Sequence, residues 1–261
     1  MTPGDSPILV TGGTGQLGAP TVLRLREAGH RVRVLSRKAD GADPDLVRGD
    51  LATGEGIAAA LDGVRTVVHL VQGGLKEDEL TERLATEAAR AGVAHLLYIS
   101  IVGIDRNQAL AYYAAKLRAE QAIQTSGVPH TILRATQFHS FVARIVDGQR
   151  RWPIAFLPNL VFQPIAIEEV VTRLVELVDA GPQGMAEDVA GPEQLTLDRI
   201  AHLWYQAHRR DKRVLRLPAP GAAMRNYARG TQLGTLPGYG RQTFAEYAQI
   251  QAARTAQAET S

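Results

Sequence analysis

The segment Ile8–Gly18, which reads ILVTGGTGQLG, strongly limits how this chain can fold. Its first three residues predict a short buried strand, and the apolar residues from Leu17 onward follow the period of a helix. Between them, Gly12 permits a tight turn, Gly15 lets the backbone approach a ligand, and Gly18 lets the helix lie close to the strand. The helix start directs N–H groups and a positive dipole end at an anion. The segment therefore predicts a dinucleotide site, and a glycine loop that merely turns is the less favoured alternative.

The composition narrows the possible classes of protein. The 261 residues suffice for one large α/β domain or a domain with an appendage, and a net charge of +2 is too balanced to favour nucleic acid as a partner. The absence of cysteine excludes disulfides, thiolate catalysis and cysteine-bound metals, and the histidines show no metal-binding spacing, so no metal is expected. No signal peptide and no apolar run of about 18 residues is visible, so we expect a cytoplasmic protein without a membrane partner.

Strands and helices alternate regularly through the first 150 residues. Apolar segments predict strands, and amphipathic segments that end at glycines predict the helices between them. This alternation predicts a doubly wound α/β fold with a parallel sheet, right-handed crossovers and helices on both faces. The expected strands cover Ile8–Val10, Arg31–Ser36, Leu46–Arg48, Thr66–Val71, His95–Ser100 and His130–Arg134.

The alternation becomes less regular after residue 150. We therefore expect a dinucleotide-binding domain over 1–150 and a small C-terminal α/β lobe over 151–261, with strands that return to the main sheet. Prolines predict an irregular loop over Trp152–Pro158, and the polar end Ala252–Ser261 is expected to fray. The segments between them predict strands over Val161–Ile167 and Met185–Ala190 and helices over Glu168–Asp179 and Leu197–His208.

The end of the second expected strand bears on the choice of cofactor. A protein that binds NAD usually has an acidic residue here to hold the ribose hydroxyls, but this chain has Arg37 and Lys38. Their charges suit the 2′-phosphate of NADP, which Arg37 can bind with two N–H groups, and two ordinary surface cations are the alternative. After the third strand, Asp50 either accepts a hydrogen bond from the adenine amino group or stabilises a turn.

Tyr112 and Lys116 are candidates for acid–base chemistry. Both fall in the helix expected over 110–125, where a spacing of four puts their side chains on one face. An ammonium group favours the phenolate of a nearby tyrosine, and the tyrosine can then exchange a proton with a substrate oxygen during hydride transfer. The lysine can also bind the cofactor ribose. An exposed pair on a surface helix is an equal alternative, although ligands in such folds bind beyond the strand ends.

The sixth strand leads into Gln137, Phe138 and His139 at the same edge of the expected sheet. Gln137 can bind the amide of the nicotinamide, and Phe138 can cover its ring. His139 can carry a proton near neutral pH, but a buried structural histidine is favoured over that role.

Several segments resemble one protein family. The motif Thr11-Gly12-x-x-Gly15-x-x-Gly18 resembles the fingerprint of extended and atypical short-chain dehydrogenase/reductases. This resemblance spans nearly the whole chain and implies a seven-stranded Rossmann domain with a small α/β lobe over the cofactor cleft. The segments that resemble the NmrA-like atypical branch are Tyr98–Asp105, Tyr112–Glu120, Thr131–His139, Phe162–Val170, Gly191–Leu195 and Gly238–Tyr247.

The resemblance also implies which residues bind NADP. In active relatives a serine or threonine slightly beyond the fifth strand assists the tyrosine, whereas here Ser100 lies at the strand end and Ile101 follows. Either Ser100 takes this role or no serine does, and the choice between an enzyme and a sensor stays open. The implied cofactor-binding residues are Gly12, Thr14, Gly15, Gln16, Leu17, Gly18, Arg37, Lys38, Asp50 and Leu51, with Val71, Ser100, Lys116 and Gln137 around the nicotinamide half.

These observations predict an NADP(H)-dependent oxidoreductase. It would transfer hydride between nicotinamide and a small carbonyl, enone or quinone, with Tyr112 as acid/base, Lys116 as the residue that tunes it, and Ser100 as an orienting group. The alternative is a non-catalytic redox sensor that changes its affinity for a partner with the state of the cofactor. A sugar-nucleotide epimerase is less favoured because the chain is short for the required substrate lobe. Substrate identity and the choice between monomer and homodimer stay open.

Overall fold

The computed structural model of the protein describes residues 6–39 and 45–260 and confirms the α/β fold. Residues 1–5, which bear on the signal-peptide expectation, and Ser261 lie outside the described residues. The chain divides into two compact units. Unit 1 comprises residues 1–100, 111–134 and 170–187, and unit 2 comprises residues 101–110, 135–169 and 188–261. The units therefore alternate along the chain, whereas the change in sequence pattern predicts a single boundary at residue 150.

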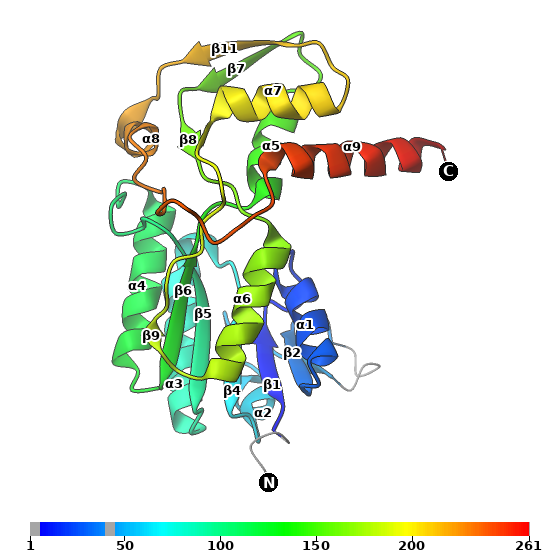
Figure 1. Cartoon of the computed structure of the whole chain (residues 1–261). Helices are drawn as coiled ribbons and strands as arrows, with labels where there is room; N and C mark the ends of the chain where they lie inside the picture. The colour runs from blue at the N-terminus through cyan, green and yellow to red at the C-terminus, as the bar shows by residue number, and fades with distance from the viewer. Residues whose placement is uncertain (1–5, 40–44, 261) are drawn as a thin grey trace. The chain divides into compact units, whose positions relative to one another are not determined.

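Unit 1 is built on a sheet whose seven strands, among the described residues, follow the order β3-β2-β1-β4-β5-β6-β9 (Figure 1). The central strand β1 is fully buried and pairs in parallel with β2 on one side and β4 on the other. From β1 the chain adds strands first on one side, toward β3, and then on the other side, from β4 onward. Sheets of this kind bind ligands at their carboxyl edge, next to the point where the order reverses. The strands are β1 Ile8–Thr11, β2 Val32–Ser36, β3 Leu46–Arg48, β4 Thr66–His69, β5 His95–Ile101, β6 His130–Ala135 and β9 Gly184–Met185.

Helices cover both faces of this sheet. On one face, α2, α3 and α4 share an apolar core with the strands, to which Leu9, Leu84 and Ile123 contribute. On the other face, α1 and α6 lie together (Figure 1), and the His30 side chain just after α1 bonds Asp179 of α6 at 2.9 Å. The helices are α1 Gly18–Glu27, α2 Ile57–Leu61, α3 Glu77–Arg90, α4 Ala111–Thr125 and α6 Ile167–Ala180, with a 3₁₀ turn, η1, over Gly74–Lys76.

Unit 2 contains two short sheets and a group of packed helices. Strand β7 pairs in parallel with β11, and β8 pairs in antiparallel with β10. Helices α5, α7 and α9 meet around aromatic rings, where His139 stacks on Tyr247 with ring centroids 5.1 Å apart and Trp204 lies 6.4 Å from the same tyrosine. The elements are α5 His139–Asp147, β7 Ile154–Pro158, β8 Val161–Phe162, β10 Leu195–Thr196, α7 Leu197–Ala207, β11 Arg213–Leu217, α8 Gly221–Ala228 and α9 Phe244–Thr260.

The structure corrects several predicted boundaries in the C-terminal half. The segment predicted to be irregular contains β7, because Ala155 and Leu157 are buried on the inner face of the sheet. The strand predicted over 185–190 shortens to β9, and among the described residues a single further bridge, from Val189 to Ala135, follows it. The strand predicted over 161–167 likewise shortens to β8. The polar C-terminal end does not fray within the described residues, because α9 continues to Thr260.

Candidate functional site

The turn between β1 and α1 depends on its glycines. Gly12 has a φ of +72°, and a Cβ there would lie 2.8 Å from the backbone of Leu70, so the turn passes directly over the end of β4. A Cβ at Gly18 would lie 2.0 Å from the carbonyl oxygen of Gly12. A Cβ at Gly15 would meet only that same oxygen, at 3.2 Å. The fold therefore requires Gly12 and Gly18, whereas Gly15 is nearly replaceable as far as the protein's own packing is concerned.

The start of α1 is available to an anion. Thr14, Gly15 and Gln16 are exposed, and the helix begins at Gly18 without any side-chain hydrogen bond at its N-terminus. Uncapped amides at a helix start carry the positive end of the helix dipole. Leu17 is different, because it is buried and its carbonyl oxygen accepts the Thr21 hydroxyl at 2.7 Å. The exposed turn and the open helix start together fit a pyrophosphate group.

The residues after β2 and β3 have distinct surroundings. Arg37 and Lys38 are exposed, and neither forms an ion pair with a described residue. Asp50 is half-buried, and its Oδ1 accepts the backbone N–H of Ala52 at 2.8 Å, so this carboxylate stabilises a turn. Leu51 is 5% exposed and belongs to the core of unit 1. Of these residues, the two cations are thus best placed to bind a negatively charged group of a ligand.

Lys116 lies inside the protein. Its ammonium donates to Glu77 Oε1 at 3.0 Å, to the Tyr98 hydroxyl at 2.9 Å and to the carbonyl oxygen of Ile99 at 3.0 Å. An ammonium has three N–H donors, so all of them are occupied. Burial lowers the pKa of Lys116, and the Glu77 carboxylate opposes this effect. In this arrangement, a bond to a cofactor ribose would require Lys116 to give up one of its protein partners.

Glu77 connects this lysine to the neighbouring strands. Its carboxylate also accepts the Tyr98 hydroxyl at 3.0 Å and the backbone N–H of Gly73 at 2.5 Å. The Tyr98 ring stacks on His69, whose two ring nitrogens lie 2.6 Å from the Thr11 hydroxyl and 3.0 Å from the Thr81 hydroxyl. Burial lowers the pKa of His69 to about 4, so this histidine is neutral. A continuous polar network therefore runs beneath the ends of β1, β4 and β5.

The pKa of Tyr112 differs from the sequence-based expectation. It is half-buried in the first turn of α4, and its hydroxyl has no hydrogen bond to any described residue. We expected the Lys116 ammonium to lower the pKa of Tyr112, but that pKa is raised well above its usual value, first by burial and then by the Glu77 carboxylate and Tyr113. The reason is that Glu77 neutralises the ammonium. Tyr112 is therefore a protonated phenol at neutral pH.

Two residues of the predicted site have buried polar side chains that lack partners among the described residues. The Ser100 hydroxyl, near the end of β5 in unit 1, is 2% exposed and makes no hydrogen bond. In unit 2, Gln137 follows β6 by two residues, and neither atom of its 9% exposed amide has a partner. Leaving such groups unpaired costs about 1–3 kcal/mol each, so both are candidates for contact with a ligand. Val71, two residues after β4, is half-buried and packs against the core of unit 1.

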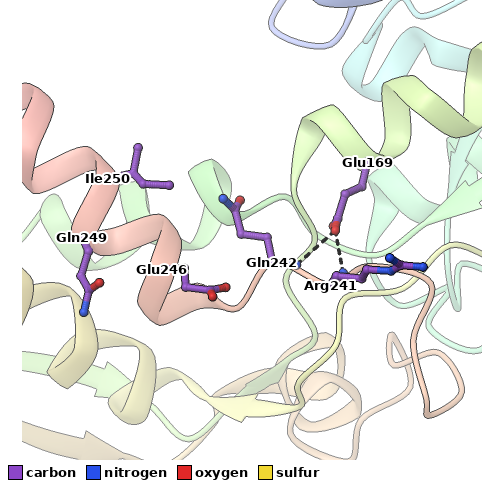
Figure 2. A pocket seen from close by; sticks show the side chains of 6 residues that line it. All are labelled: Glu169, Arg241, Gln242, Glu246, Gln249 and Ile250. Carbon is purple, nitrogen blue, oxygen red and sulfur yellow. Dashed lines mark hydrogen bonds between the residues drawn. The ribbon is translucent and has the colours of Figure 1, made fainter.

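His139 has the structural role that the sequence favours. It is 1% exposed, its Nε2 donates to the carbonyl oxygen of Gln242 at 3.1 Å, and burial lowers its pKa to about 4. A shallow groove of about 600 Å³ lies nearby in unit 2, where Glu169 accepts the backbone N–H groups of Arg241 and Gln242 (Figure 2). None of the residues that line this groove belongs to the predicted site.

Sequence reasoning missed Glu77 and Tyr98, the two residues that determine the surroundings of Lys116. Tyr98 lies within a segment that carries the family resemblance, and Glu77 opens the acidic first turn of α3. Their contact with Lys116 joins residues far apart in the chain, so no local pattern reveals it. Among the described residues, no group of side chains could hold a metal ion, and no helix is long and apolar enough to cross a membrane.

A parallel sheet whose first strand runs through a glycine turn into an uncapped helix defines a Rossmann-type dinucleotide-binding protein. A family model described as NAD(P)H-binding matches residues 12–143. The chain belongs to this NAD(P)H-binding family, which confirms the resemblance to NmrA-like atypical short-chain dehydrogenase/reductases.

Individual relatives share different portions of the chain. A (4-alkanoyl-5-oxo-2,5-dihydrofuran-3-yl)methyl phosphate reductase of Streptomyces griseus is 32% identical over 200 residues, which cover 72% of this chain and 69% of the relative. A photosystem II assembly factor of Trieres chinensis is 29% identical over 51% of this chain, which spans only 46% of that relative. The NADP(H) complex of the Citrobacter sp. triphenylmethane reductase matches 94% of this chain and 99% of its own with a TM-score of 0.78, and at 17% identity this shows a shared fold alone.

Proposed function

We propose that this protein is an NADP(H)-dependent oxidoreductase that acts on a small carbonyl, enone or quinone. The observation that carries the proposal is that two hydroxyls, of the buried Ser100 and the half-buried Tyr112, bond to no described residue in the unit that carries the glycine turn. The Streptomyces relative supports the substrate class, because the substrate in its name bears oxo and alkanoyl groups.

The described residues fit the proposed cofactor. The open start of α1 suits the pyrophosphate, and the exposed Arg37 and Lys38 suit a 2′-phosphate, since charged N–H groups bind phosphate oxygens strongly. The unpaired amide of Gln137 suits the carboxamide of nicotinamide, which both donates and accepts hydrogen bonds. Asp50, Leu51 and Val71 follow strands that end at the same edge of the sheet. The bound cofactor would supply the hydride.

In the proposed mechanism, Tyr112 donates a proton to the substrate oxygen as negative charge develops there. The raised pKa keeps the phenol protonated, which is the state that reduction needs. The Ser100 hydroxyl donates a second hydrogen bond to the same oxygen. Lys116 acts as a positioning residue, because its bond to the carbonyl oxygen of Ile99 fixes α4 against β5 one helical turn from Tyr112.

The test is NADPH oxidation by the purified protein with a panel of quinones, enones and aldehydes. Tyr112→Phe should lower turnover by about 10²-fold, as expected for loss of a general acid, without weakening NADPH binding. The matched control is Tyr113→Phe, which removes a hydroxyl from the next position of the same helix, where the side chain is 2% exposed. This control should retain turnover.

The alternative function is redox sensing without turnover, and the assembly factor among the relatives is the finding that favours it. A sensor needs different affinities for NADP⁺ and NADPH, because a ligand shifts a conformational equilibrium only through differential binding. Absence of turnover across the panel, together with a several-fold difference between these affinities, would replace the enzyme proposal. Full activity in Tyr112→Phe would contradict only the role of the tyrosine and would leave the enzyme proposal intact.

A further inference from the structure

The small sheet formed by β7 and β11 exposes an apolar face. In a parallel pair, partnered residues point to the same side, and the register places Phe156 beside Leu215 and Pro158 beside Leu217. Phe156, Leu215 and Leu217 are 45%, 43% and 44% exposed. The opposite face is covered by α7, where Arg216 pairs with Asp198 at 2.5 Å. We call the outer surface of Phe156, Pro158, Leu215 and Leu217 the apolar face.

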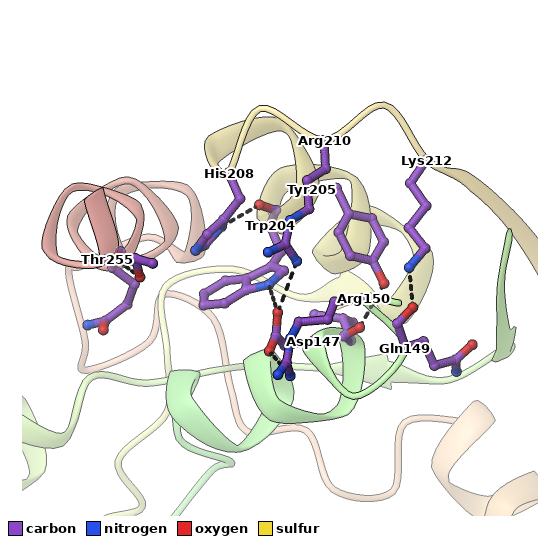
Figure 3. Close-up of polar contacts among 11 residues, drawn as sticks. Asp147, Gln149, Arg150, Trp204, Tyr205, His208, Arg210, Lys212 and Thr255 are labelled. Atoms are coloured by element: carbon purple, nitrogen blue, oxygen red, sulfur yellow. Dashed lines mark hydrogen bonds and ion pairs between the residues drawn. The ribbon is translucent and has the colours of Figure 1, made fainter. Parts of the chain in front are cut away.

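A group of cations borders one end of this face. Because the two strands are parallel, the segments that precede them lie at the same end of the sheet, and Lys212 before β11 donates to the carbonyl oxygen of Gln149 before β7. Figure 3 shows this junction, where Asp147 pairs with Arg150 at 3.1 Å and with Arg210 at 3.5 Å. The other carboxylate in these segments is Asp211. The basic cluster comprises Arg150, Arg151, Arg209, Arg210, Lys212 and Arg213.

Trp152 lies between the basic cluster and the start of β7. It is 66% exposed, the largest exposure among the large apolar side chains of unit 2. The chain's other tryptophan, Trp204, is 8% exposed, and its Nε1 donates to Asp147 at 3.3 Å (Figure 3). A protein surface with an exposed indole, cations and apolar side chains binds favourably at the boundary between lipid headgroups and acyl chains.

We propose that the apolar face, Trp152 and the basic cluster together bind the surface of an anionic lipid bilayer. The apolar side chains and Trp152 enter the interface while the basic cluster contacts lipid phosphates. This inference goes beyond the proposed oxidoreductase activity and does not depend on it. It also revises the sequence-based expectation of no membrane partner, which rests on the lack of a spanning segment, because binding at the surface needs none.

The size and charge of this surface favour lipid over other occupants. Two strands of five residues present only about 17 Å by 10 Å, whereas a stable protein interface buries about 800 Å² on each partner. A second copy would bring two basic clusters together, which like-charge repulsion opposes. The face is mainly aliphatic, and leucine side chains do not provide the stacking surfaces that bind nucleic acid bases.

The test is flotation of the full chain with vesicles at physiological salt, using equal parts of phosphatidylcholine and phosphatidylglycerol or phosphatidylcholine alone. We expect binding to the anionic vesicles and a blue shift of Trp152 fluorescence, which Trp152→Phe removes. Phe156→Ser/Leu215→Ser should weaken binding about tenfold or more, and Arg151→Glu/Arg213→Glu should do the same. The controls change apolar and basic residues elsewhere, at exposed sites, and are Leu23→Ser/Leu75→Ser and Arg225→Glu/Arg254→Glu.

Two results would overturn the proposal. One is absence of binding to anionic vesicles by the unmodified protein. The other is equal binding by the test variants and their controls, which would show attraction by net charge alone. Light scattering at several protein concentrations, without vesicles, detects self-association of the protein. A dimer that Phe156→Ser/Leu215→Ser dissociates would assign the apolar face to a second copy instead. The altered residues are exposed, so each variant should fold, and circular dichroism is the check.

Discussion

At the scale of single residues, Lys116 and Tyr112 lie one helical turn apart and yet have opposite surroundings. Spacing correctly places both in α4. It does not reveal that the lysine is 3% exposed and bound to Glu77, because that contact joins two distant parts of the chain. The positive charge of Lys116, which the sequence predicts to act on Tyr112, is therefore neutralised by Glu77 inside the protein. Tyr112 is left as a neutral phenol.

The first prediction concerns this buried ion pair. Glu77→Gln leaves the ammonium of Lys116 without its counter-charge, so the free energy of unfolding should fall by about 3 kcal/mol or more. Lys116→Met/Glu77→Gln removes both charges and should cost less than the sum of the two single changes. Urea denaturation of the four proteins measures the coupling. Strictly additive losses would mean that the pair contributes nothing beyond its separate contacts.

The second prediction concerns Arg37 and the choice of cofactor. The unmodified protein should bind NADPH about tenfold or more tightly than NADH, because a charged hydrogen bond contributes about 1.5–3 kcal/mol. Arg37→Ala should remove most of this preference and leave NADH affinity nearly unchanged. Calorimetry at low salt measures both affinities. Arg90→Ala, an exposed change at the end of α3, is the control. Equal affinities in the unmodified protein would refute the assignment.

At the scale of elements, the glycine turn allows binding to be separated from folding. Gly15→Val adds a side chain whose Cβ meets only one protein atom, the Gly12 oxygen at 3.2 Å, and this side chain would enter the space that we propose for the pyrophosphate. It should abolish dinucleotide binding and shift the melting temperature only slightly. Gly18→Ala brings a Cβ to 2.0 Å from a backbone oxygen and should lower the melting temperature by several degrees. Cofactor binding by Gly15→Val would show that the site is misplaced.

Burial and local pattern explain which elements the sequence could predict. The central strands of unit 1 are continuous apolar runs covered on both faces, so their pattern is unambiguous. Strand β7 is stabilised by β11, more than 50 residues later, and that pairing leaves no local signal. Helix α9 is rich in alanine and glutamine, which favour helices by propensity but give little apolar periodicity. The glycine turn after β1 was predictable because its glycines are adjacent in the sequence, whereas the network around Lys116 joins distant residues and was not.

At the scale of the whole molecule, three buried histidines make stability depend on pH. Burial lowers the pKa of His69, His95 and His139 to about 4 from a usual value of 6.5. The first two belong to unit 1 and the third to unit 2. Between pH 6.5 and 4, the unfolded chain binds protons at these sites and the folded chain does not. The part of the unfolding free energy that depends on these neutral histidines is therefore fully present above pH 6.5 and is lost as the pH falls toward 4.

The last prediction follows from this linkage. Each histidine should lower the free energy of unfolding by up to about 1.4 kcal/mol for each pH unit within that window. His69→Gln removes one titrating site, so the variant should lose less stability than the unmodified protein between pH 6.5 and 4.5, even if it is less stable at pH 7. Gln206→Ala, an exposed change that removes no titrating group, should keep the original slope. Urea denaturation at a series of pH values measures these slopes, and identical slopes for His69→Gln and the unmodified protein would show that His69 does not stay neutral in the fold.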